Sequence, residues 1–122
     1  MTAAGYPERH GTEYARRLEG LLEAVSHSQL SESQKNNLAI LGGECNYLFK
    51  FNGSTSQLEW VEESLWRLDE MHTWEEEDIK TLLDLAQTSL KDCAESLRLN
   101  VQIIRKPRAV GSDPFLAILT QD

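Results

Sequence analysis

The sequence lacks the basic excess, the long apolar run and the leader peptide that mark several large classes of protein. Twenty acidic residues against 12 basic ones give a net charge of −8, whereas a general nucleic-acid binder carries a basic excess. No apolar run approaches the roughly 18 residues that span a bilayer. The opening MTAAGYPERHGTEYARR has no apolar stretch of the kind found in a secretory signal. We therefore expect no nucleic-acid partner, no membrane segment and no secretion.

Cysteine and histidine are also scarce. Two cysteines, Cys45 and Cys93, stand far apart in the chain, which favours reduced thiols in a cytoplasmic protein. The three histidines are scattered, and none has a second histidine at ligand spacing. The sequence therefore predicts no zinc site.

The 122 residues are enough for one domain at most. Residues 1–11 contain glycine, proline and charged residues, and we expect them to be disordered. Residues 12–111 are predicted to form a single α+β domain. The tail 112–122 is uncertain, because the apolar run Phe115–Leu119 is either a last strand or the exposed apolar stub of a longer chain that has been cut short.

Three helices are predicted. Apolar positions from Thr12 onward mark one helix face, and Ser31 with Gln34 has the spacing of a capping box. The clearest element is a long amphipathic helix capped by Thr73 and Glu76, with Asn100 as its stop. Its helical spacing is kept by Ile79, Leu82, Leu83, Ala86, Leu90, Cys93, Ala94 and Leu97. The acidic run 75–78 lies in its first turn, where the helix dipole stabilises negative charge. We therefore interpret this run as part of the helix start and not as a metal site.

Strand patterns lie on both sides of this helix. The apolar run Leu38–Leu41 precedes a second strand in which Tyr47, Phe49 and Phe51 alternate with other residues. Asn52-Gly53 indicates a turn. Further strands are predicted at 58–61 and 101–104. Together these patterns predict an α+β fold in which a small, mainly antiparallel sheet carries the long helix on one face and is preceded by an N-terminal helix.

The best candidate anion site is the cationic cluster of Arg105, Lys106 and Arg108 after the strand at 101–104. Guanidinium forks match phosphate oxygens, and lysine adds a point charge. If the strand continues, Arg105 and Lys106 point to opposite faces, so at most two of the three converge. The alternative interpretation is a solvated loop that pairs with some of the many acidic residues.

A second candidate is the string Gly42-Gly43-Glu44-Cys45-Asn46. Paired glycines allow positive φ and a close backbone approach, and the Glu44 carboxylate and Asn46 carboxamide follow directly. The alternative is a bulge or tight bend between strands. The string is not a P-loop, because the lysine of that motif is missing.

Three strings together resemble the IMP-specific 5′-nucleotidases of fungi and protozoan parasites, which belong to the haloacid dehalogenase superfamily. They are SQKNNLAILGGECNYLFKF, LEWVEESLWRLDEMHTWEEEDIKTLLDLAQTSL and IIRKPRAVG. The resemblance runs from about Leu21 to Gly111, and beyond Gly111 the sequence no longer looks like the family. It implies a cap-like α/β insertion from the middle of a longer, magnesium-dependent phosphatase that hydrolyses IMP to inosine and phosphate.

Enzymes of this type use an Asp-x-Asp pair, with one aspartate as nucleophile and the other as acid and base. This chain has no Asp-x-Asp. The resemblance therefore implies Mg²⁺ as the cofactor of the whole enzyme, while no ligand for it and no catalytic residue is assigned here. The resemblance implies IMP as the partner, with ATP as an effector and a homo-oligomer as further expectations.

Two functions from different classes follow. In the first, the chain is a fragment of an IMP-specific 5′-nucleotidase, inactive alone, that contributes the cap and the surroundings of the substrate. In the second, it is a small acidic interaction module without catalysis, an interpretation suggested by the missing nucleophile and the apolar run Phe115–Leu119.

Overall fold

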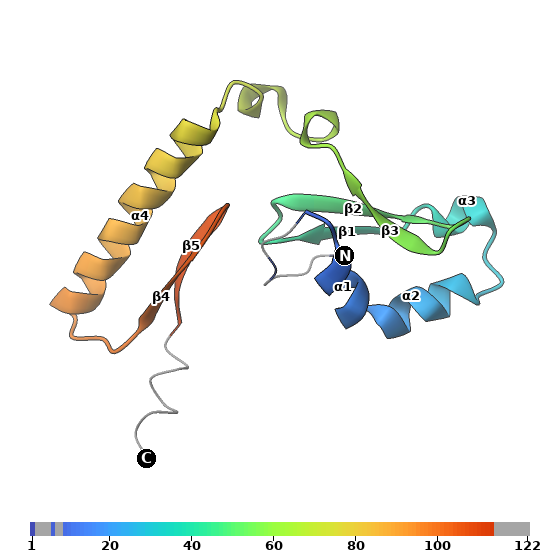
Figure 1. Ribbon diagram of the computed structural model, residues 1–122, viewed down its shortest axis with the longest axis horizontal. Coiled ribbons are helices and arrows are strands. Elements are labelled where there is room, and N and C mark those ends of the chain that lie inside the picture. The colour runs from blue at the N-terminus through green and yellow to red at the C-terminus, as the bar shows by residue number, and fades with distance from the viewer. Residues whose placement is uncertain (2–5, 7–8, 114–122) are drawn as a thin grey trace, which may run out of the picture. The chain divides into compact units, whose positions relative to one another are not determined.

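The computed structural model describes Met1, Tyr6 and residues 9–113. These residues belong to two compact units, Met1–His72 and Thr73–Asp122, which are coloured blue to green and yellow to red in Figure 1. The prediction of one domain over 12–111 stays a prediction, as do those of a disordered 1–11 and an uncertain 112–122. The run Phe115–Leu119 lies outside the described residues.

The first unit opens with the predicted N-terminal helix, which the structure divides in two. Helix α1 spans Thr12–Arg17 and α2 spans Glu19–Ser26. Between them Leu18 has φ −105° and ψ 12°, which departs from helical geometry. The predicted apolar face is retained, because Tyr14 and Leu22 are buried. The two helices thus present one interrupted apolar face.

The short helix α3, Glu32–Lys35, has the predicted capping box. The Ser31 backbone N–H donates to Gln34 Oε1 at 2.9 Å, and the Gln34 N–H donates to Ser31 Oγ at 3.2 Å. Both bonds satisfy groups that the start of a helix leaves without an intrahelical partner.

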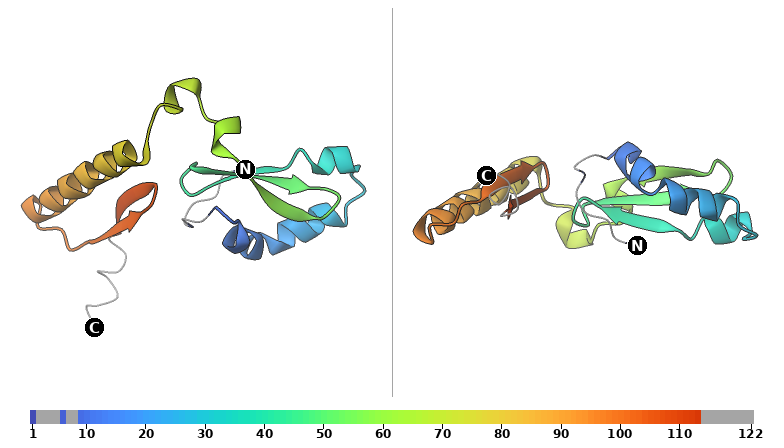
Figure 2. Two further views of the ribbon diagram at one scale, coloured as in Figure 1. Left: turned by 45° about the horizontal axis from the view of Figure 1, so that its top comes forward. Right: turned by 90° about the horizontal axis from the view of Figure 1, so that it is seen from below.

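Three antiparallel strands complete the first unit. They are β1 (Ala39–Gly42), β2 (Tyr47–Asn52) and β3 (Gln57–Val61), in the order β1-β2-β3. Phe49 lies opposite Ile40 on one side and Trp60 on the other. The views in Figure 2 show α1 and α2 along one face of this sheet.

The predicted alternation in β2 is confirmed, because Tyr47, Phe49 and Phe51 are all buried. Phe49 packs against the Tyr14 ring, with 5.3 Å between ring centroids. Burying an aromatic side chain contributes on the order of 2–3 kcal/mol. This cluster, which also includes Ile40, is the core of the first unit. Two 3-10 turns, Glu63–Leu65 and Asp69–Met71, follow β3.

The second unit is built on the long predicted helix, α4 (Glu76–Ser96). Its predicted start at Thr73 is wrong: Glu75 is the N-cap, and the Glu75 N–H donates to Asp78 Oδ2 at 3.0 Å. The helix was predicted to run to Leu97, which is its C-cap, but Asn100 is not the residue that stops it. Arg98 has φ 53°, and the Leu99 N–H donates to Ala94 O at 2.8 Å. The Arg98 N–H donates to Glu95 O at 3.0 Å. The two bonds form a Schellman motif with arginine in the place that glycine usually takes.

Strands β4 (Gln102–Lys106) and β5 (Ala109–Asp113) form an antiparallel hairpin that contacts α4 (Figure 1). The α+β class and the long helix on a sheet are confirmed. The expectation that strands before and after α4 share one sheet is wrong, because β1–β3 and β4–β5 are separate sheets. The reason is a two-residue turn, Pro107-Arg108, which lets residues 109–113 pair with β4 instead.

No described helix combines the length and the apolar character needed to cross a membrane.

Candidate functional site

The β4–β5 turn brings Arg108 to the first turn of α4. Its Nη1 lies 2.8 Å from Glu76 Oε2, and its Nη2 lies 2.5 Å from Glu76 Oε1. The Arg108 side chain is only 9% exposed, whereas that of Glu76 is 77% exposed. This two-bond geometry, the strongest arrangement of an arginine with a carboxylate, ties the tip of the hairpin to the start of the helix.

Arg105, within β4, reaches the middle of α4. Its Nη2 lies 3.0 Å from Asp84 Oδ1, and its Nη1 donates to Gln87 Oε1 at 3.0 Å. Asp84 also accepts a bond from Lys80 Nζ at 2.8 Å. The hydrogen bond from Lys80, and after it the one from Arg105, lower the pKa of Asp84 below its ordinary value. The same Lys80–Asp84 bond raises the pKa of Lys80.

The three predicted cations therefore do not share one acceptor. Arg105 and Arg108 contact α4 at positions eight residues apart, which corresponds to about 12 Å along a helix axis. Lys106 follows Arg105 in the strand, so its side chain leaves the opposite face. Both arginine forks hold helix carboxylates, which is the ion-pair alternative that the sequence left open. Anion binding by this cluster stays a prediction.

The glycine string forms the turn between β1 and β2. Gly43, Glu44 and Cys45 have φ of 56°, 57° and 68°, and Asn46 Nδ2 donates to Gly43 O at 2.7 Å. Left-handed backbone is costly for residues other than glycine, so surrounding contacts must hold this turn. The predicted positive φ and close approach are present at Gly43, where an added Cβ would lie 2.5 Å from the Tyr47 ring.

One of those contacts is the buried hydroxyl of Tyr14. It accepts a hydrogen bond from the Gly43 N–H and donates to Tyr6 O at 2.9 Å. The turn that carries Glu44 and Asn46 is thus fastened to α1. These two residues belong to the first unit and the arginines to the second, so a substrate role for either set stays a prediction.

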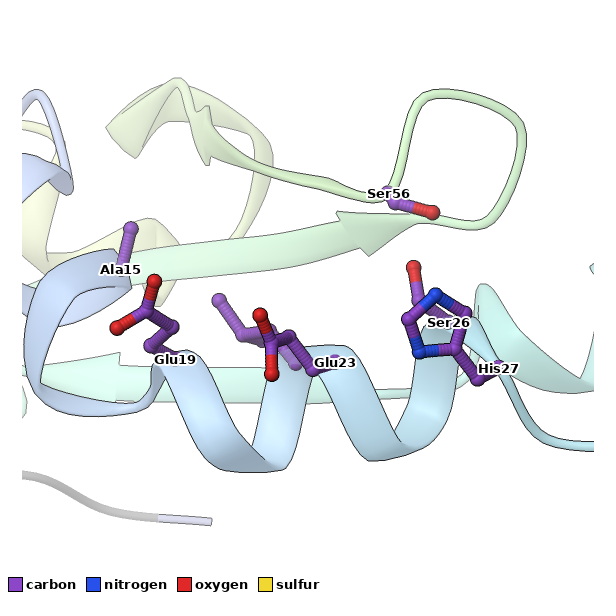
Figure 3. Close-up of a pocket in the computed structure, with 7 residues that line it drawn as sticks. Ala15, Glu19, Glu23, Ser26, His27 and Ser56 are labelled. Atoms are coloured by element: carbon purple, nitrogen blue, oxygen red, sulfur yellow. The ribbon is translucent and has the colours of Figure 1, made fainter.

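A pocket that the sequence analysis did not single out runs along α2 (Figure 3). Figure 3 shows Glu19, Glu23 and His27 on the side of α2 that faces Ser56, which precedes β3. The signal was their spacing of four residues, which places them on one helix face. Two carboxylates at the rim disfavour an anionic ligand such as a nucleotide phosphate.

The described residues contain no group of three histidine, cysteine, aspartate or glutamate side chains that could hold a metal ion. No residue of this part of the chain is assigned to Mg²⁺.

Comparison with known proteins gives one family. The model of the IMP-specific 5′-nucleotidase family matches residues 1–119. IMP-specific 5′-nucleotidase 1 of Aspergillus fumigatus is 49% identical over 117 residues, covering 94% of this chain and 26% of that protein. The Schizosaccharomyces pombe protein of the same name is 44% identical over 116 residues, covering 95% of this chain and 28% of its own length.

Solved structures agree. A mutant of Plasmodium falciparum IMP-nucleotidase with IMP bound matches with a TM-score of 0.75 and 31% identity, over 93% of this chain and 30% of that chain. The ATP-bound form of the Plasmodium protein matches with a TM-score of 0.69 and 27% identity, over 91% of this chain and 26% of that chain.

These matches correct one prediction. The resemblance does not end at Gly111, because the family model continues to residue 119. The chain spans only about a quarter of the length of the curated relatives. Over nearly its whole extent, this chain belongs to the IMP-specific 5′-nucleotidase family.

Proposed function

We propose that the chain is the cap-like part of an IMP-specific 5′-nucleotidase and contributes the surroundings of the substrate rather than the catalytic nucleophile. The observation that carries the proposal is the family match over residues 1–119 in a sequence that has no Asp-x-Asp. In the proposed enzyme, IMP is hydrolysed to inosine and phosphate with Mg²⁺ held by residues outside this chain. ATP as an effector, a homo-oligomer and a cytoplasmic location belong to the same proposal.

The test uses a hybrid protein. The 117 matching residues of the Aspergillus fumigatus relative are replaced by this chain, and phosphate release from IMP is measured with Mg²⁺. We expect release by the hybrid and none by the 122-residue chain, because only the hybrid has access to an aspartate nucleophile. The unmodified relative is the positive control. Hydrolysis by the 122-residue chain itself, or an inactive hybrid that folds, would contradict the proposal.

Within this function, Arg105 or Arg108 is proposed to exchange its helix carboxylate for the phosphate of IMP or of a regulatory nucleotide. The exchange is better supported for Arg105, because its side chain is 29% exposed and its partner Asp84 is 51% exposed, and exposed ion pairs are weak. Arg108 is only 9% exposed and holds Glu76 through two bonds. Losing one charge-assisted contact costs roughly 1.5–3 kcal/mol, about tenfold to a hundredfold in affinity.

The variants Arg105→Ala and Arg108→Ala in the hybrid test this exchange through the KM for IMP and the affinity for ATP. Lys91→Ala removes a cation from the exposed side of α4 and serves as the control. Asp84→Asn separates the two roles of Arg105: a phosphate competing with Asp84 binds more tightly in this variant, whereas a purely structural pair leaves the KM unchanged. The proposed roles of Glu44 and Asn46 are tested in the same assay with Glu44→Gln and Asn46→Ala.

A further inference from the structure

Helix α4 has a wider uncharged face than its hairpin covers. The side facing β4–β5 carries half-buried residues at helical spacing: Ile79, Leu83, Ala86, Leu90 and Ala94. A second row lies one position earlier at each step, about 100° around the helix. It begins with the acidic Asp78 and continues with Leu82, Leu85, Ser89 and Cys93, all exposed. We call the last four residues the α4 stripe.

Two of the four residues of the α4 stripe are leucines that are exposed to water. Leu82 is 51% exposed and Leu85 is 65% exposed. Lys80, Asp84 and Lys91 lie on another side of the helix, whereas Asp78 and Asp92 border the stripe. A helix that faces solvent on this side would carry polar residues there. The row instead has the spacing of a helix face that packs against a neighbour.

The α4 stripe runs into a surface pocket at its N-terminal end. This pocket is lined by Thr73, Trp74, Asp78 and Leu82, with a volume of about 400 Å³. The Trp74 side chain is 48% exposed. An exposed tryptophan beside exposed leucines is the composition of an interface centre rather than of a free surface.

The second unit also lacks a core of its own. Among the described residues 73–113 none is fully buried, whereas the first unit buries Tyr14, Ile40 and Phe49 almost completely. A helix on a two-stranded hairpin gives too little burial for independent stability. Additional polypeptide must therefore cover some of this apolar surface.

We propose that the α4 stripe and the Trp74 pocket are the docking surface for the part of a family member's polypeptide that this chain does not span. The occupant is identified by length: the chain covers 26% and 28% of two relatives to which it is 49% and 44% identical. Roughly three quarters of each relative thus lies outside the matched segment. An apolar face of that remainder fits the uncharged stripe. The proposal rests on family membership and not on hydrolysis of IMP.

Cys93 lies in the stripe and gives a native probe. We compare its rate of alkylation in the 122-residue chain and in the Aspergillus fumigatus hybrid, reading labelled peptides by mass spectrometry. Leu85→Cys supplies a second stripe position. Thr88→Cys, exposed on the same helix but outside the stripe, is the matched control. We expect labelling of Cys93 and Leu85→Cys to slow by about tenfold or more in the hybrid, with Thr88→Cys little changed.

Equal rates in the two proteins at both stripe positions would overturn the proposal. Slow labelling of Cys93 already in the 122-residue chain would also overturn it. If that labelling then became faster when the protein was diluted, the occupant would be a second copy of the chain. If the rate did not change on dilution, the occupant would be the chain's own residues. Protection at Thr88→Cys as well would show general burial of the helix. Phosphate release from IMP by the same hybrid reports the proposed function separately, because protection requires contact only.

Discussion

At the scale of single residues, two glycines have different surroundings. Gly42, at the end of β1, packs closely against a buried ring, whereas Gly20, in α2, has open space around it. An ideal Cβ on Gly42 would lie 2.6 Å from the Tyr14 ring. That ring is buried, and its hydroxyl is hydrogen-bonded to three backbone groups, the Gly43 N–H, the Tyr6 N–H and the Tyr6 carbonyl, so it cannot move aside freely. A Cβ on Gly20, within α2, would meet nothing within 4 Å.

These two glycines predict opposite effects of the same substitution. Gly42→Ala should lower the free energy of unfolding by about 1–3 kcal/mol, because it overpacks the core. Gly20→Ala should raise it by about 0.5–1 kcal/mol, because alanine is the better helix former. Urea denaturation of the 122-residue chain measures both. A Gly42→Ala variant as stable as the parent would show that the Tyr14 contact is loose.

At the scale of elements, α4 carries an ion-pair network whose strength depends on pH. The pKa of Asp84 is lowered mainly by the hydrogen bond from Lys80. A carboxyl with a lowered folded pKa stabilises the fold above the ordinary carboxyl range, and this contribution is lost as the pH falls through the folded pKa. Arg105 shares Asp84, so the same acidification weakens the link between α4 and β4.

Lys80→Gln should therefore raise the pKa of Asp84 toward its ordinary value. Carbon-detected NMR of the Asp84 carboxyl during an acid titration measures the change. Lys91→Gln removes an equal charge from α4 at a position that does not contribute to the pKa of Asp84, and it should leave that pKa nearly unchanged. Equal shifts of the Asp84 pKa in the two variants would show that the Lys80 hydrogen bond is not what lowers it.

The left-handed residue at the C-terminus of α4 leads to a second prediction at the scale of elements. Arg98 has φ 53° after the last helical turn, a conformation that costs a residue with a side chain about 1 kcal/mol or more. Arg98→Gly should therefore make the opening of α4 less favourable by about 1 kcal/mol. Lys91→Gly, in the helix interior, should favour opening by about the same amount. Native-state amide exchange of α4 measures both, and faster exchange in Arg98→Gly would contradict the prediction.

At the scale of the whole molecule, the two units should differ in stability. Every residue of the described core lies in Met1–His72, and β2 is the central strand of its sheet. Amides of Phe49 and Phe51 should exchange more slowly than those of Leu83 and Leu90, by a factor of about ten or more in the 122-residue chain. Equal protection in the two units would mean that a core shared by both stabilises α4.

Local patterns determined much of this protein. The alternation of Tyr47, Phe49 and Phe51 predicted which side of β2 is buried, because side chains alternate in a strand whatever its neighbours are. The Ser31–Gln34 capping box was predicted for a similar reason, since its two bonds span only three residues. The family could be named from three strings of sequence, and the comparisons confirmed it.

The tertiary structure decided what depends on residues far apart in the chain. Glu76 was expected to close a cap at Thr73, yet it lies at the first helical position and binds Arg108, 32 residues away. The hairpin turn at Pro107 separated β4 and β5 from the sheet of β1–β3. Arg105 and Arg108 read as a cluster in sequence, but strand geometry and the carboxylates of α4 set them apart. Pairings of this kind depend on which surfaces meet, and no periodicity within one segment records that.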